Sequence, residues 1–166
     1  KPPKSGGVRT LPSDQTPWGV EVVYDDSFIS NTSGGSGIKV AVLDTGVKAT
    51  HVDIESRVFD CKDFTGKRRP ITNDKCDDKN GHGTHVAGTI LADGGADKKG
   101  IYGIAPEASL LAYKVCGNNG SCWADDIANA IVTATDNGAH VINMSLGSDL
   151  ESFLLANAID YAFENG

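Results

Sequence analysis

Three short apolar runs constrain the fold of this chain more than any other feature of its sequence. They cover residues 39–44, 109–115 and 140–146, and the first lies between Gly37 and Gly46. The length and Val content of the first run are typical of a strand that is buried in a parallel sheet. The other two runs have the same character, so the sequence predicts three buried strands.

Predicted helices alternate with these strands. Apolar residues recur at helical spacing over residues 83–92 and 124–137. Ser148, followed three residues later by Glu151, matches a capping box and predicts a third helix over residues 150–164. Strand and helix therefore alternate three times, which is the order of a doubly wound α/β fold. We expect a three-layer α/β sandwich with a mostly parallel central sheet.

The remaining segments are predicted to be irregular. Residues 1–35 end in a Ser/Gly-rich loop, and residues 47–81 are polar and loop-rich. The second segment contains Asp77 and Asp78, which we interpret as a solvated acidic turn, with a bound cation as the alternative. The sequence halts at a typical helix exit where a further strand is due, so the sheet is expected to be incomplete.

Length and charge limit the classes of function. A chain of 166 residues suits one domain, and a net charge of −7 argues against nucleic acid as a partner. No run of about 18 apolar residues exists, so the sequence predicts no membrane-spanning helix. Residues 1–12 lack the apolar core of a signal peptide, and we expect that any export signal has already been removed.

The four cysteines allow three disulfide pairings. We favour the two local pairs, Cys61 with Cys76 and Cys116 with Cys122. No two cysteines have the spacing of a zinc ligand pair. Disulfides would place the protein in an oxidising, extracellular compartment, and four free buried thiols are the alternative.

Asp44 and His82 are the strongest candidates for chemistry. Asp44 ends a predicted buried strand, at the sheet edge where active sites form in open parallel sheets. His82 lies between two glycines at a predicted helix start, which leaves its imidazole unobstructed. The alternatives are an Asp that caps a turn, a packed His, or a metal pair of His82 with His85. A metal pair is disfavoured because zincins place their two His residues four apart with a Glu between them.

Four blocks of the sequence resemble the subtilase family of serine proteases, in the order in which that family carries them. The resemblance extends from about Gln15 to Gly166 and implies that the chain is the N-terminal two thirds of one catalytic domain. It implies that Asp44 is the catalytic Asp and that His82 is the catalytic His. The blocks are VAVLDTG at 40–46, GHGTHVAGT at 81–89, GIAP at 103–106 and VINMSLG at 141–147.

The resemblance also implies a binding site for polypeptide substrates. A peptide held extended between two edges of the protein gains affinity from main-chain hydrogen bonds and selectivity from alternate side-chain pockets. The implied edge residues are Gly120, Ser121 and Cys122 on one side and Ser145, Leu146 and Gly147 on the other.

A structural Ca²⁺ site is a further implication of the resemblance. Gln15 matches the amide ligand of the family and Asp53 matches its carboxylate ligand, while the loop 91–100 would add carbonyls with Asp93 or Asp97. Such an ion would attach the N-terminal arm to the body of the domain. The alternative is that these side chains are solvated.

The resemblance places the nucleophilic Ser and the oxyanion-hole Asn of the family beyond Gly166. His82 would act as general base and then acid, with Asp44 orienting it, so activity should prefer neutral to alkaline pH. We expect a secreted endopeptidase that was cut after Gly166 and keeps its C-terminal fragment as a partner. The alternatives are a catalytically inactive peptide-binding module and a truncated form of an ordinary protease.

Overall fold

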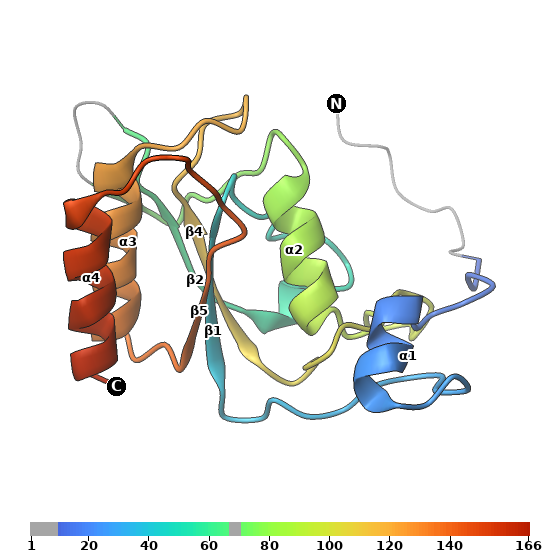
Figure 1. Ribbon diagram of the computed structural model, residues 1–166. Coiled ribbons are helices and arrows are strands. Elements are labelled where there is room, and N and C mark those ends of the chain that lie inside the picture. The colour runs from blue at the N-terminus through green and yellow to red at the C-terminus, as the bar shows by residue number, and fades with distance from the viewer. Residues whose placement is uncertain (1–9, 67–70) are drawn as a thin grey trace.

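The computed structural model describes residues 10–66 and 71–166 (Figure 1). Residues 1–9, the start of the segment predicted to be irregular, lie outside the described part. The described elements are α1 (Trp18–Tyr24), β1 (Lys39–Asp44), the 3-10 helix η1 (Glu55–Arg57), β2 (Val58–Asp63), β3 (Thr72–Asn73), α2 (His82–Leu91), β4 (Ser109–Lys114), α3 (Ala124–Asp136), β5 (Val141–Asn143) and α4 (Phe153–Glu164).

The five described strands form one sheet in the order β3-β2-β4-β1-β5. All neighbours run parallel except β3, which pairs antiparallel with β2 at one edge. Helix α2 covers one face of the sheet, and α3 and α4 lie side by side on the other (Figure 1). The predicted three-layer α/β sandwich with a mostly parallel central sheet is therefore confirmed.

Alternating side chains of β1 explain why its sequence is a continuous apolar run. Val40 and Val42 pack toward α2, whereas Ala41 and Leu43 pack toward α3 on the other face. Both faces of the strand are covered, so every position after Lys39 is buried. Because β1 pairs parallel with β4 and β5, the carboxyl ends of these strands meet at one edge of the sheet. The candidate catalytic residues lie at this edge.

The central elements follow the sequence predictions closely. Strands β1 and β4 and helices α2 and α3 match their predicted ranges to within one residue at each end. Helix α1 and the strands β2 and β3 were not predicted. Half of the residues in strand β2 are charged, so it is not an apolar run, and a two-residue β3 has no periodicity to detect.

Two predicted boundaries near the C-terminus are wrong. The strand predicted over 140–146 is shorter, because β5 pairs with β1 only at Val141–Asn143 and the chain then leaves the sheet. The predicted capping box does not form: the Ser148 hydroxyl bonds Leu150 instead. Helix α4 starts later, and its N-cap is Ser152, whose hydroxyl accepts from the Leu155 N–H.

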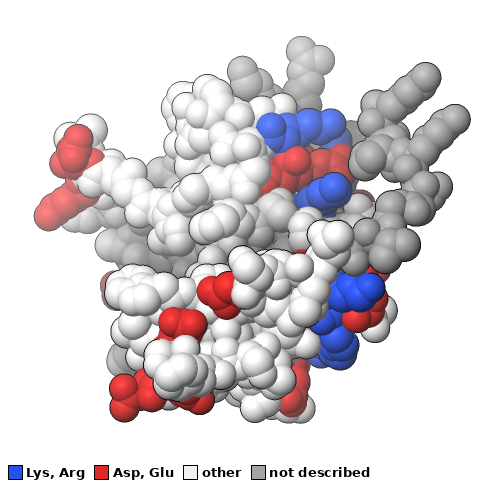
Figure 2. Space-filling view, turned by 90° about the vertical axis from the view of Figure 1, so that its right-hand side faces the viewer, with Lys and Arg blue, Asp and Glu red and all other residues white. Residues whose placement is uncertain are grey.

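Charges are unevenly distributed on the face of the molecule that Figure 2 shows. The described Lys and Arg side chains lie on the right with Asp and Glu beside them, whereas the Asp and Glu side chains on the left have no Lys or Arg next to them. In the described part of the chain, no helix is long and apolar enough to cross a membrane.

Core packing under β4 gives a first testable prediction. Leu111 is fully buried at the centre of the sheet, between β1 and β2. Replacing Leu111 by Ala should lower the free energy of unfolding by about 2–5 kcal/mol, because the closely packed layers cannot collapse into the cavity. Urea denaturation measures this loss. The control Val22→Ala alters an exposed position on α1, and an equal loss in both variants would contradict the predicted core.

Candidate active site

Asp44 is the last residue of β1, and its carboxylate is completely buried. The Thr45 backbone N–H donates to its Oδ1 over 2.7 Å. A buried carboxylate needs such donors, because burial removes the water that would otherwise solvate it. The first hydrogen-bond donor to Asp44 is thus the backbone of the next residue.

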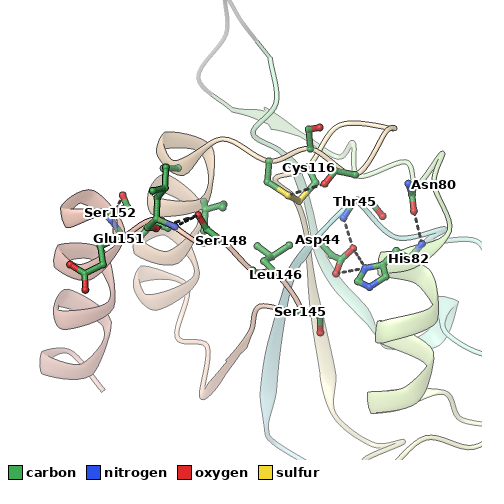
Figure 3. A pocket seen from close by; sticks show the side chains of 18 residues that line it. Asp44, Thr45, Asn80, His82, Cys116, Ser145, Leu146, Ser148, Glu151 and Ser152 are labelled. Atoms are coloured by element: carbon green, nitrogen blue, oxygen red, sulfur yellow. Dashed lines mark hydrogen bonds and ion pairs between the residues drawn. A yellow bond between two sulfur atoms is a disulfide. The ribbon is translucent and has the colours of Figure 1, made fainter.

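His82 supplies the second donor to Asp44. It is the first residue of α2, and its Nδ1 lies 2.8 Å from Asp44 Oδ1 and 2.9 Å from Oδ2 (Figure 3). A carboxylate only accepts hydrogen bonds, so Nδ1 carries the proton and Nε2 is left to act as a base. The His82 side chain is 51% exposed, so its ring is open to solvent.

Gly83 makes this close approach of α2 to β1 feasible. A Cβ at this position would collide with the Gly46 carbonyl oxygen and lie 3.0 Å from the Asp44 side chain. The helix can therefore start directly against the end of the strand only with glycine at this place. The glycines around His82 thus do more than leave its ring unobstructed.

Asp78 was interpreted from the sequence as part of a solvated turn, and this interpretation is wrong. Its Oδ1 accepts from the Asn80 N–H at 2.9 Å and from the Gly81 N–H at 2.8 Å. Its Oδ2 accepts from the Thr84 N–H at 3.0 Å and from the Thr84 hydroxyl at 2.6 Å. Asp78 therefore caps the first turn of α2, a role that Gly81 cannot perform because it has no side chain.

The hydrogen bonds to Asp78 also change its acidity. Partial burial acts to raise the pKa of Asp78, but the hydrogen bonds from Gly81, Thr84 and Asn80 outweigh it and lower the pKa to about 2. The carboxylate is therefore ionised over the whole physiological range of pH.

Lys114 is a second residue of the site that sequence reasoning missed. It ends β4, is almost completely buried, and its Nζ donates to the carbonyls of Thr45 and, at 2.9 Å, Cys116. Burial lowers the pKa of Lys114, and the charges of Asp63 and Asp78 oppose that shift. A Lys at the end of an apolar strand was the one available signal in the sequence.

A groove of about 750 Å³ opens beside the Asp44–His82 pair (Figure 3). All six residues predicted to bind substrate line it, and they come from two separate segments of the chain. These residues are Gly120, Ser121 and Cys122, which precede α3, and Ser145, Leu146 and Gly147, which follow β5.

A disulfide closes the wall of the groove that precedes α3. The structure joins Cys116 to Cys122, which also face each other in an isolated antiparallel bridge. Inside this loop the Gly117 N–H donates to the Ser121 carbonyl over 2.8 Å, and Gly120 has a φ of 83°. The loop is therefore a short closed turn attached to the end of β4.

The second disulfide joins Cys61 of β2 to Cys76. The Cys76 carbonyl accepts from the Val47 N–H over 2.8 Å, which ties this loop to the segment after Asp44. The structure thus contains the two local pairs favoured from the sequence, and none of the four cysteines is a free thiol.

The four predicted calcium ligands do not all come together. The Gln15 amide lies against the loop 91–100, with its Nε2 at 2.9 Å from the Lys98 carbonyl and 2.7 Å from the Gly100 carbonyl. The buried Asp53 carboxylate lies against Gly100, where a Cβ would collide with it. The Gln15 NH₂ group donates to both carbonyls. The amide would have to turn its oxygen toward them before one amide, one carboxylate and two carbonyls could form the set of hard oxygen ligands that Ca²⁺ prefers.

Asp93 and Asp97 have other contacts. The Asp93 carboxylate is bonded to Ser56 and to Arg57, whose Nε is 2.9 Å away. Asp97 Oδ1 accepts from the Lys99 N–H within its own loop. Asp93 is thus ion-paired with Arg57, and its role as a ligand stays a prediction. The described part of the chain contains no group of three or more His, Cys, Asp or Glu side chains that could hold a metal.

The fold and the site define a class of protein. A buried carboxylate that orients an imidazole, at the carboxyl edge of a parallel sheet and beside an open groove, can serve as the acid–base part of a nucleophilic hydrolase site. A family model described as the subtilase family matches residues 35–166. The chain therefore belongs to the subtilase family.

Known proteins similar to the chain carry protease names. Subtilisin from Bacillus sp. (strain TA39) is 54% identical over 159 residues, which cover 93% of this chain and 37% of that protein. The major intracellular serine protease of Bacillus subtilis (strain 168) is 40% identical, with coverage of 98% and 53%.

Solved structures show the same relationship. Sphericase superposes with a TM-score of 0.90 at 51% identity, and the S41 psychrophilic protease with 0.87 at 52%. Each match covers 93% of this chain and 51% of the solved chain. The chain thus spans about half the length of these solved relatives.

The lowered pKa of Asp78 predicts how stability depends on acid. Its pKa is about 2 in the folded protein and 3.8 ordinarily, so its stabilising contribution is complete above about pH 4 and is lost as the pH falls toward 2. Asp78→Asn should therefore flatten the loss of unfolding free energy between pH 4 and pH 2, measured by denaturation at each pH. The control Asp77→Asn should keep the slope, and an equally steep slope in Asp78→Asn would contradict the assignment.

Proposed function

We propose that this chain supplies the Asp and the His of a Ser-His-Asp endopeptidase. The observation that carries the proposal is the pair of short contacts between His82 Nδ1 and the Asp44 carboxylate. Asp44 keeps the imidazole in the tautomer whose Nε2 is free to accept a proton, and it stabilises the imidazolium that forms. The proposal rests on geometry that two separate elements, β1 and α2, produce together.

The proposed reaction proceeds through an acyl-enzyme. His82 Nε2 takes the proton of a serine hydroxyl while the serine oxygen bonds to the scissile carbonyl carbon. The imidazolium then returns the proton to the leaving amine as the carbon–nitrogen bond breaks. A water molecule, activated by the same ring, hydrolyses the ester and restores the serine.

The nucleophile and the oxyanion-hole Asn are assigned to a C-terminal part of the protein. The chain spans only about half of its solved relatives, which leaves room for both groups in the other half. Within the described residues, no serine hydroxyl is hydrogen-bonded to the His82 ring, and Ser145 accepts from the Asn143 amide instead. Ser145 therefore has a place in the wall of the groove rather than at the base.

The substrate is proposed to be a polypeptide held in extended conformation. The two walls of the groove come from the segments before α3 and after β5, and both line the same groove as His82. Such edges bind a peptide mainly through its backbone, so that peptides of many sequences can bind. The pockets between the edges then select among side chains.

The protein is proposed to act outside the cell. Two disulfides form within this chain, and disulfides persist in oxidising compartments. One relative of the chain is named an intracellular protease, so the family alone does not decide the compartment. The disulfides therefore carry this part of the proposal.

A structural Ca²⁺ ion is proposed at Gln15 and Asp53. The Asp53 carboxylate, the carbonyls of Lys98 and Gly100 and the Gln15 amide, with its oxygen turned toward these carbonyls, are the groups that would hold it. The ion would stabilise the folded state by attaching the segment before α1 to the loop after α2.

Removing the disulfide in the groove wall should change substrate binding. In the complete protein, Cys116→Ser with Cys122→Ser should raise KM for an extended peptide several-fold and change kcat little, because the free loop must be ordered on binding. The expected loss of stability is about 2 kcal/mol. The matched control, Cys61→Ser with Cys76→Ser, should lose stability without this rise in KM.

Peptide kinetics measure both constants in the two double variants. An unchanged KM in the Cys116/Cys122 variant would contradict the role assigned to the closed loop. An equal rise in KM in both double variants would show a general loosening of the domain instead.

The test of the proposed function uses a fluorophosphonate probe and intact-mass spectrometry under denaturing conditions. After treatment of the purified native protein, the mass of the probe should be found on a polypeptide segment outside this chain, because the probe modifies a serine activated by His82. Labelling should disappear in His82→Ala. A single unlabelled species of 17.3 kDa would contradict the proposal and favour an inactive peptide-binding module or a truncated form.

A further inference from the structure

Asp78 lies between the two segments that carry the catalytic pair. On one side its Oδ1 accepts from the hydroxyl of Thr45, the residue after Asp44, over 3.0 Å. On the other side its Oδ2 accepts twice from Thr84, two residues after His82. One carboxylate therefore binds both the end of β1 and the first turn of α2.

The Thr45 hydroxyl completes this connection. It accepts from the backbone N–H of Gly83 over 3.0 Å while it donates to Asp78. The Thr45 N–H in turn donates to Asp44, and its carbonyl accepts from the buried Lys114. Every polar group of Thr45 thus has a partner that fixes the turn on which Asp44 depends.

We propose that Asp78 is a positioning residue that, through Thr45 and Thr84, holds the end of β1 and the start of α2 in the one arrangement that places His82 Nδ1 on Asp44. This inference rests on the proposed function, since it names a further residue of the same site. Asp78 does not belong to the described residues that line the groove, so it acts through its neighbours.

A carboxylate is required here by the number and kind of its donors. Five described groups donate to Asp78, three of them backbone N–H groups that precede or open α2. Ionised Asp accepts at both oxygens, whereas Asn would present an NH₂ group to one set of donors. Substitution by Asn therefore keeps the size of the side chain and removes one of its two hydrogen-bond-accepting oxygens.

The neighbouring Asp77 provides a matched control. It is exposed, it has the same charge, and no described hydrogen bond involves its carboxylate. Asp77→Asn therefore makes the same chemical change one residue away without touching β1 or α2.

The first experiment compares the two variants in the complete protein, with its C-terminal part present. We expect Asp78→Asn to lower kcat by about 10- to 100-fold, because displacement of a catalytic base by about 1 Å has effects of this size. KM should change little, since the groove walls do not depend on Asp78. Asp77→Asn should match the unmodified protein in both constants.

The second experiment measures positioning without activity. The proton between His82 Nδ1 and Asp44 should give a low-field NMR resonance at low temperature. We expect that resonance to disappear or to exchange faster in Asp78→Asn and to persist in Asp77→Asn. A purely structural role would lower the melting temperature but leave both this signal and kcat unchanged below it.

Thr45→Val supplies a second route if Asp78→Asn does not fold. It removes the hydroxyl through which the segment after β1 binds both Asp78 and the Gly83 N–H of α2, so it should reproduce the loss of kcat and of the resonance. In the double variant the two losses should be less than additive in free energy, because both act through one contact.

The outcomes separate this inference from the proposed function. An unmodified protein that neither cleaves peptides nor reacts with the probe would end the proposed function, while the NMR comparison would still decide the role of Asp78. Retention of kcat and of the low-field resonance in Asp78→Asn, or equal losses in Asp77→Asn, would overturn the inference.

Discussion

The contact between a buried carboxylate and an exposed imidazole is the constraint on which the rest of the structure depends. Asp44 is fully buried at the end of a central strand and must be supplied with donors there. The His82 ring is one of them, and it can reach the carboxylate only because α2 starts at the same edge of the sheet. The order of the strands and the position of α2 therefore bring the two side chains of this hydrogen-bonded pair together.

The loops around this pair are held by polar side chains as well as by apolar packing of Val47 and Cys76. Asp78 caps the start of α2 and binds Thr45. Lys114 donates to the carbonyls of Thr45 and Cys116, which follow the ends of β1 and β4. Both groups are charged and partly or almost fully removed from water, so each would be costly without its partners. Their hydrogen bonds restrict the turn after β1, and the proposed proton-transferring pair needs such restriction.

The two disulfides extend the same principle to the borders of the site. One fixes the wall of the groove that follows β4, and the other ties β2 to the segment beside the turn after Asp44. Cys116 and Cys76 are both buried members of the hydrophobic core. Each covalent link therefore attaches a loop at the border of the site to the packed core.

The sequence by itself determined the central strands, the two helices beside them and the family. It also singled out Asp44 and His82 as the candidate catalytic residues. These features are local or lie in contiguous blocks: an apolar run covered on both faces, an apolar period, a glycine-flanked His. Only the tertiary structure decided that Asp78 and Lys114 belong to the site and that Asp93 pairs with Arg57. It also decided where β5 ends and where α4 begins. The physical reason is that these outcomes depend on partners distant in sequence, whose donors, acceptors and pairing edges become neighbours only when β1, β4 and α2 pack together.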